Sequence, residues 1–102
     1  MEKKIDIEVE ISRDIQNHWI WRRADHLRAF VFLAMMFKER QVRSGGFAII
    51  HLRINNPKDE LGLRTNQIAT NFLKKLDRTG VIQLKKMLGG YNVVFCQTGL
   101  FR

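Results

Sequence analysis

The sequence predicts a small α+β domain in which three helices pack against an antiparallel sheet. Residues 66–76 carry apolar side chains at helical spacing, and residues 24–39 form a longer helical stretch. Three short β-prone runs, at 47–54, 81–84 and 91–96, supply the strands. Their order along the chain, helix, strand, short helix, helix and hairpin, defines the expected fold class.

Residues 1–22 are expected to form an N-terminal arm and residues 23–102 the domain itself. Within the arm, residues 5–11 alternate strictly between β-branched apolar and acidic side chains, as a strand with one buried face does. Such a strand would pair inside the domain or with a second copy of the chain. Of Trp19 and Trp21, we expect at least one to pack into the core.

The helix over residues 24–39 is apolar on nearly every face between 29 and 37. Its expected core stripe is Leu27, Phe30, Val31, Ala34 and Phe37, and its other faces carry Phe32, Leu33, Met35 and Met36. A helix that is apolar all round is normally buried all round. We therefore expect either a central position or a homodimer through this helix and residues 5–11.

Capping residues mark the ends of the other elements. Ser12 is expected to cap a short turn, and Pro57 to begin a short second helix that Gly62 ends. The main helix opens near Thr65 and stops at Gly80, the residue best suited to a left-handed cap.

The last two β-prone runs are expected to pair as a hairpin. Gly89 and Gly90 lie between residues 81–84 and 91–96, and paired glycines between such runs favour a tight turn. Lys85 and Lys86 then fall in the connection between the two strands.

Basic charge gathers in the C-terminal part of the chain. The formal charge of the 102 residues is +8 and the isoelectric point is about 10.3. Residues 1–12 hold two lysines against four acids, whereas residues 64–102 hold seven basic residues against one acid, Asp77. Such a field favours a polyanion, and nucleic acid is the usual one. An anionic membrane is the weaker alternative, because no segment joins a lysine-rich face to a clean apolar face.

The sequence also indicates a cytoplasmic protein. Cys96 is the only cysteine, so no intrachain disulfide can form and a reducing compartment is expected. We expect Cys96 to be buried as a small hydrophobe. The longest apolar run, 29–37, has nine residues, whereas a membrane span needs about twenty.

The segment ELGLRTNQIATNFLKKLDRTGVIQLKK at residues 60–86, followed by GGYNVVF, resembles part of many winged-helix DNA-binding proteins. In those proteins a leucine-glycine turn precedes a helix that ends in a KKLxxxGVI step. Residues 15–37, IQNHWIWRRADHLRAFVFLAMMF, resemble the start of DnaD-like and phage replication-initiator winged-helix domains. The resemblance implies a winged helix-turn-helix with a wing and an added strand-like arm, acting on DNA in transcription regulation or replication initiation.

The helix that opens near Thr65 offers a face for double-stranded DNA. Asn66, Gln67 and Asn71 are the base-reading candidates, because a terminal amide can bond both N6 and N7 of adenine in the major groove. Arg64, Lys74 and Lys75 suit phosphates, which supply affinity without sequence information. The full set of candidate DNA-binding residues is Arg64, Thr65, Asn66, Gln67, Thr70, Asn71, Lys74, Lys75, Arg78, Lys85 and Lys86.

Enzymatic functions fit the sequence poorly. The three histidines lie in three different elements, without metal-ligand spacing to Cys96, and no glycine-rich loop has phosphate-binding spacing. We expect no catalysis, cofactor, metal or small-molecule substrate. The alternative to DNA binding is a protein assembly module, a homodimer or a partner-binding domain, built on the arm, the tryptophans and the apolar helix.

Overall fold

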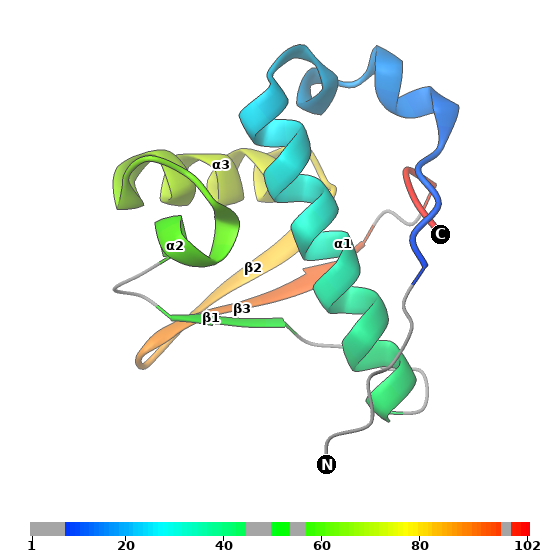
Figure 1. Cartoon of the computed structure of the whole chain (residues 1–102). Coiled ribbons are helices and arrows are strands. Elements are labelled where there is room, and N and C mark those ends of the chain that lie inside the picture. The colour runs from blue at the N-terminus through cyan, green and yellow to red at the C-terminus, as the bar shows by residue number, and fades with distance from the viewer. Residues whose placement is uncertain (1–7, 45–49, 54–56, 97–98) are drawn as a thin grey trace.

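The computed structural model describes residues 8–44, 50–53, 57–96 and 99–102. Two 3-10 helices come first in the described chain, and three α-helices and three strands then pack around one core (Figure 1). The elements are η1 (Arg13–Asn17), η2 (Trp19–Arg22), α1 (Ala24–Ser44), β1 (Ile50–Arg53), α2 (Pro57–Leu61), α3 (Asn66–Arg78), β2 (Ile82–Met87) and β3 (Gly90–Phe95).

The three strands pair antiparallel in the order β1-β3-β2. β2 and β3 form a hairpin with the two-residue turn Leu88-Gly89, where Gly89 has a φ of +86°, a conformation that favours glycine. β1 lies along the other edge of β3 and places Ile50 opposite Val93. The expected hairpin is therefore confirmed, but β2 is longer and the turn is shorter than the sequence indicated.

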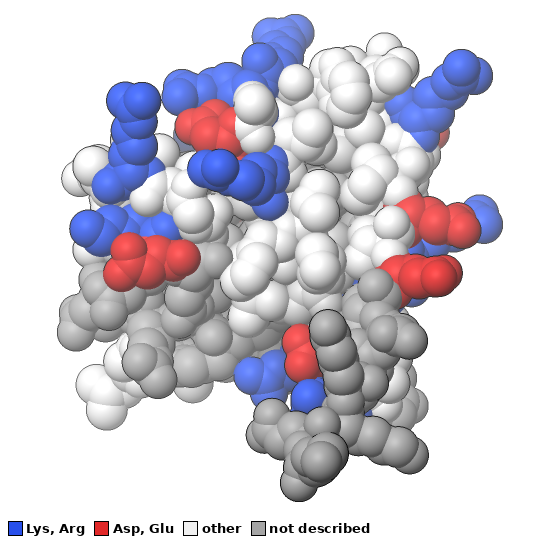
Figure 2. Space-filling model, in the orientation of Figure 1, with Lys and Arg blue, Asp and Glu red and all other residues white. Residues whose placement is uncertain are grey.

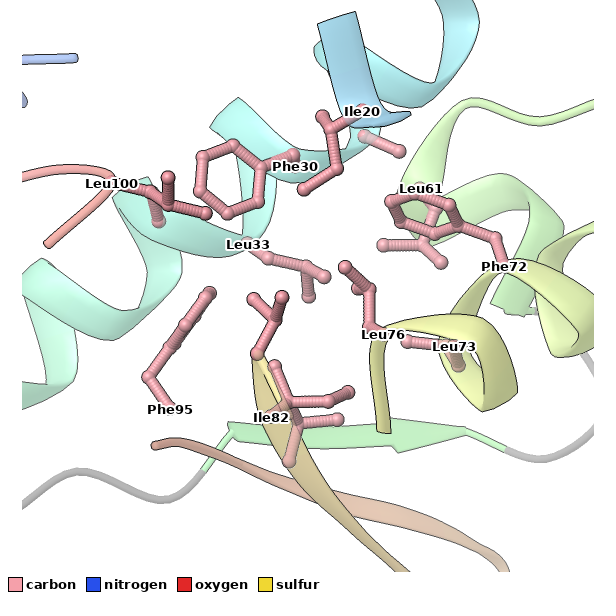
Figure 3. Close-up of a cluster of buried hydrophobic side chains, with 14 of the residues drawn as sticks. Ile20, Phe30, Leu33, Leu61, Phe72, Leu73, Leu76, Ile82, Phe95 and Leu100 are labelled. Carbon is pink, nitrogen blue, oxygen red and sulfur yellow. The ribbon is translucent and has the colours of Figure 1, made fainter. Parts of the chain in front are cut away.

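The core lies where α1 and α3 pack on the sheet. Figure 3 shows Phe30 and Leu33 of α1 converging with Leu76 of α3 and with Ile82 of β2. Phe30 stands edge-on to Phe95 of β3, with ring centroids 6.1 Å apart. Alternate residues of the hairpin face this core, because Ile82, Val93 and Phe95 are buried whereas Gln83 and Val94 are more exposed.

The expected fold class, a winged helix-turn-helix with three helices, is wrong, and the chain is a small α+β domain. Among the described residues, only α1 and α3, with 21 and 13 residues, are longer than two helical turns. α2 has five residues because Pro57 begins it and Gly62, with a φ of +69°, follows its last residue. The stretch taken for a wing connection is regular strand, since Lys85 and Lys86 pair with Asn92 and Tyr91.

The N-terminal arm also differs from expectation. Residues 5–7 of the predicted strand lie outside the described residues, and of residues 8–11 only Ile11 makes a β-bridge, to Phe101. Around this bridge, Glu10 and Arg102 exchange two backbone hydrogen bonds of 2.8 and 2.7 Å. The arm is thus held to the end of the chain.

Other local expectations had mixed outcomes. Ser12 caps η1, because its hydroxyl accepts a hydrogen bond from the Asp14 N–H, as predicted. α1 runs five residues beyond the predicted end, since no glycine or proline interrupts it before Gly45. Cys96 is exposed rather than buried, because it lies one residue beyond the core-facing Phe95 and on the opposite side of the sheet.

None of the helices in the described ranges is long and apolar enough to cross a bilayer.

Candidate nucleic-acid interface

α3 forms because its two ends are capped and one of its faces is apolar. The Thr65 hydroxyl accepts a hydrogen bond of 3.1 Å from the Ile68 N–H, which satisfies one free donor at the start of the helix. At the other end, the N–H groups of Gly80 and Val81 return to the carbonyls of Asp77 and Leu76, at 3.1 and 2.9 Å. These paired bonds are the Schellman arrangement, in which glycine supplies the left-handed residue.

The outer face of α3 carries a stripe of polar and basic side chains. Gln67, Asn71, Lys74 and Arg78 are all exposed, and they recur at helical spacing along the whole length of α3. The opposite face is buried through Ala69, Phe72, Leu73 and Leu76. We call these four exposed residues the α3 stripe. It contains two amides, two cations and no acid.

Asn66 and Thr65, predicted to contact DNA, have structural contacts instead. The Asn66 side-chain oxygen accepts a hydrogen bond of 3.2 Å from the backbone N–H of Lys58, in the first turn of α2. The Thr65 hydroxyl is occupied as the cap of α3. Asn66 thus joins α3 to α2 and Thr65 caps α3, and both residues lie to one side of the α3 stripe.

Lys75 lies on the other flank of α3 and faces an aromatic cluster. Its ammonium nitrogen is 4.5 Å from the centroid of the Trp19 ring. The Trp19 Nε1–H points to the Thr79 hydroxyl at 3.4 Å, and the same ring stands edge-on to His26 and Phe72. Lys75 therefore holds η2 against α3 rather than joining the α3 stripe.

The histidine in this cluster is poorly placed to carry a proton. Burial lowers the pKa of His26 below its ordinary 6.5, and Arg23 and Lys75 lower it further, although Asp25 acts in the opposite sense. The imidazole stacks on Phe72 with a centroid separation of 5.0 Å. Burial also lowers the pKa of His18, whose Nδ1 accepts a hydrogen bond from the Ile20 N–H.

Asp25 is fixed at the start of α1 by hydrogen bonds. Desolvation raises the pKa of its carboxyl, but bonds from the Arg23 guanidinium, at 3.1 Å, and from the His26 N–H, at 2.9 Å, outweigh desolvation and lower it. The start of α1 therefore carries a stable negative charge.

Lys85 and Lys86 point to opposite faces of the sheet. Leu84, which packs against the core, and Lys86 share one face, whereas Lys85 lies on the other. β2 is joined to the last turn of α3 because the Asp77 carboxylate accepts a 3.4 Å hydrogen bond from the Leu84 N–H. The structure thus separates two lysines that the sequence placed together.

The remaining predicted residues, Arg64 and Thr70, differ in exposure. Arg64 is exposed just before α3, and Thr70 is half-buried. Figure 2 shows Lys and Arg side chains gathered over the side of the molecule where α3 and the start of α1 lie, and an uncharged band over the front of α1. A surface hollow lies elsewhere, at the terminal bridge, where Phe37, Phe101 and Arg102 are among its lining residues.

Sequence reasoning missed the cluster of Trp19, His26, Thr79 and Lys75. Its members come from three segments, so no spacing along the chain connects them. The one available signal was the His18-Trp19-Ile20-Trp21 run, from which we predicted that one indole packs inward. That prediction is confirmed, since Trp19 packs against the core whereas Trp21 is 46% exposed.

Comparison of the chain with protein-family models, with curated proteins and with solved structures found no match, so none of them identifies a winged-helix or DnaD-like domain.

Proposed function

We propose that the chain binds double-stranded DNA, without catalysis, by placing the α3 stripe in the major groove. The observation that carries the proposal is the composition of this stripe, in which Gln67 and Asn71 are followed by Lys74 and Arg78 on one exposed helical face. A helix has the width that the major groove admits, and its polar side chains can reach base edges there.

The two halves of the stripe have different roles in the proposal. Gln67 and Asn71 read bases, with adenine as the preferred partner of a terminal amide. Lys74 and Arg78, helped by Arg64 before the helix, neutralise phosphates and set the register on the duplex. Lys85 and Lys86 reach the backbone separately, one from each face of the hairpin.

Four of the originally predicted residues act only indirectly in this proposal. Thr65 and Asn66 position α3, and Lys75 anchors it to Trp19. Thr70 is half-buried and contributes its packing. Their substitution changes the presentation of the α3 stripe rather than removing a contact to DNA.

Selective duplex binding of this kind serves transcription regulation or replication initiation. Either role places the protein in the cytoplasm with the chromosome, where the free, exposed Cys96 remains reduced. Assembly with a protein partner is the second candidate function, and the observation that favours it is the exposed apolar side of α1, where Phe32 is 38% and Met35 is 46% exposed.

The test is a titration of a fluorescently labelled duplex, followed by anisotropy at several salt concentrations. We expect the logarithm of the association constant to fall linearly with the logarithm of salt concentration, by about 0.9 per neutralised phosphate. The double variant Lys74→Glu/Arg78→Glu should bind at least about tenfold more weakly than the wild type.

A second double variant gives a control with the same change in net charge. Arg13→Glu/Arg102→Glu reverses two exposed cations in η1 and in the C-terminal segment, which both lie away from α3 (Figure 1). The proposal fails if both double variants lose the same affinity, or if binding does not depend on salt.

A further inference from the structure

The outer face of α1 carries a seam of side chains with the spacing of a helix-packing surface. Its members are Arg28, Phe32, Met35, Glu39 and Val42, separated by four, three, four and three residues. This alternation is the pattern by which one helix packs along another. Phe32, Met35 and Val42 are 38%, 46% and 61% exposed, so the described chain leaves the seam uncovered.

The charges that flank the apolar centre of the seam are arranged so that the helix complements a reversed copy of itself. Along the helix the order is Arg28, the pair Phe32 and Met35, then Glu39 and Val42. In an antiparallel pair with a two-fold axis between Phe32 and Met35, each Phe32 meets the other chain's Met35. Arg28 then lies opposite Glu39, so both charged residues of the seam face their opposites.

This register also uses the whole helix. The midpoint between Phe32 and Met35 nearly coincides with the midpoint of Ala24–Ser44, so two copies would overlap along almost all of α1. At 1.5 Å per residue, the shared length is about 30 Å. A parallel pair would instead set Arg28 against Arg28 and Glu39 against Glu39, and such like-charge contacts are strongly disfavoured.

The charged members of the seam are available for these contacts. Arg28 is exposed, and its guanidinium donates one hydrogen bond of 2.8 Å to the Gly62 carbonyl. A guanidinium has five N–H donors, so others can pair with a carboxylate. Glu39 is paired with Arg43 within the helix at 3.2 Å, but this pair is solvent-exposed and easily exchanged.

We propose that two copies of the chain form a two-fold symmetric dimer through antiparallel packing of α1, with Phe32 against Met35 at its centre and Arg28 against Glu39 on either side. An isologous contact of this kind closes on itself and forms no larger assembly. The dimer does not depend on DNA binding, since the seam and the α3 stripe lie on different helices.

Sedimentation equilibrium or light scattering of the purified chain, from about 1 µM to about 1 mM, tests the dimer. The mass should rise from 12.0 kDa towards twice that value with concentration. Arg28→Glu alone and Glu39→Arg alone each create two like-charge contacts, so each should weaken dimerisation at least about tenfold.

Mixing the two single variants gives the decisive result. One chain then carries glutamate at both positions and the other carries arginine at both, so a heterodimer regains opposite charges at both contacts. The equimolar mixture should dimerise within about threefold of the wild type. Recovery on mixing also shows that neither variant had simply lost its fold.

Arg40→Glu is the matched control, because Arg40 is an exposed cation on the same helix but lies outside the seam. It should leave the dimer unchanged. The proposal is overturned if the wild type remains monomeric throughout the concentration range, if the mixture is as weak as its components, or if Arg40→Glu is as damaging as Arg28→Glu.

Discussion

Lys75 holds its ammonium 4.5 Å from the centre of the Trp19 ring, whereas its neighbour Lys74 is exposed on the α3 stripe. Two adjacent lysines of the same helix therefore have different roles. One joins two parts of the fold, and the other is free to meet a ligand.

This difference predicts opposite effects for two matched substitutions. Lys74→Gln should reduce the salt dependence of DNA binding by about 0.9 in the log-log slope and leave stability unchanged. Lys75→Gln should destabilise the fold by about 0.5–1 kcal/mol, the worth of a cation–π contact at an exposed site. Duplex titrations and urea unfolding of both variants test the assignment, and equal behaviour of the two would contradict it.

A second matched pair consists of Asn66 and Asn71. Asn66→Ala removes the acceptor of the Lys58 N–H and should lower the free energy of unfolding by about 1 kcal/mol. Asn71→Ala, at an exposed position, should change that free energy by less than about 0.5 kcal/mol. In a binding-site selection experiment, however, only Asn71→Ala should relax the preference for adenine at one position of the site.

The lowered pKa of His26 predicts acid sensitivity. The folded protein binds a proton on His26 less readily than the unfolded chain, whose histidines titrate near the ordinary 6.5. Stability conferred by the neutral ring is therefore present above about pH 6.5 and falls as the pH decreases from there towards the lowered pKa. His18 contributes in the same direction.

Thermal unfolding between about pH 7.5 and about pH 5 measures this effect. The midpoint of the wild type should fall as the pH decreases, and the fall should be smaller in His26→Gln and smallest in His18→Gln/His26→Gln. An unchanged pH profile in the double variant would exclude both histidines as the cause.

Substitution of Gly80 should lower the stability of the protein because of the backbone conformation at this position, and not because a side chain would clash with its surroundings. Its φ is +81°, and no atom lies within 4 Å of the place a Cβ would occupy. Gly80→Ala should therefore cost about 1–2 kcal/mol of left-handed strain. Gly99→Ala is the control, since Gly99 is equally open and lacks a positive φ. Equal unfolding midpoints for the two variants in urea would refute this account.

Phe101 is predicted to be one of the most important residues for stability. Its ring lies edge-on to Phe95, Phe30 and Phe37, with centroid separations of 4.8, 5.8 and 5.8 Å. Phe101→Ala should lower the free energy of unfolding by about 3–5 kcal/mol. A loss below about 1 kcal/mol in urea unfolding would mean that the terminal segment is not part of the core.

The sequence predicted those parts of the fold that have a local signal. The start of α1, the Thr65 cap, the Gly80 stop and the hairpin all follow from residue spacing or from the special conformations of glycine and proline. α2 was also expected to be short, because only Lys58 to Leu61 fit between Pro57 and Gly62.

The errors have a common physical cause, which is contact between residues far apart in the chain. The residues next to Phe101 in the sequence form no helical or strand pattern of apolar residues, so nothing in the local sequence indicates that Phe101 is buried. The alternation at residues 5–11 indicated a strand. Of the described residues 8–11, however, only Ile11 forms a β-bridge, to Phe101. The winged-helix expectation relied on the order of the elements, and that order does not fix where a strand ends, so it did not show that Lys85 and Lys86 belong to β2.

The candidate site was predicted in outline but not in detail. Helical spacing placed Gln67, Asn71, Lys74 and Arg78 together, and the structure shows them on one exposed face. Spacing could not reveal that Asn66 bonds to α2 or that Lys75 faces Trp19, because both partners come from other segments.

The bridge between Glu10 and Arg102 has a mechanical consequence. The two chain ends leave this antiparallel pair on the same side, so a force applied to the termini would open its hydrogen bonds one after another, as in a zipper, and not all at once in shear. The terminal pair should therefore separate at low force, before the hairpin and the helices are loaded. In a stretching experiment, the arm would detach first and expose Phe101 while the rest of the domain remained folded.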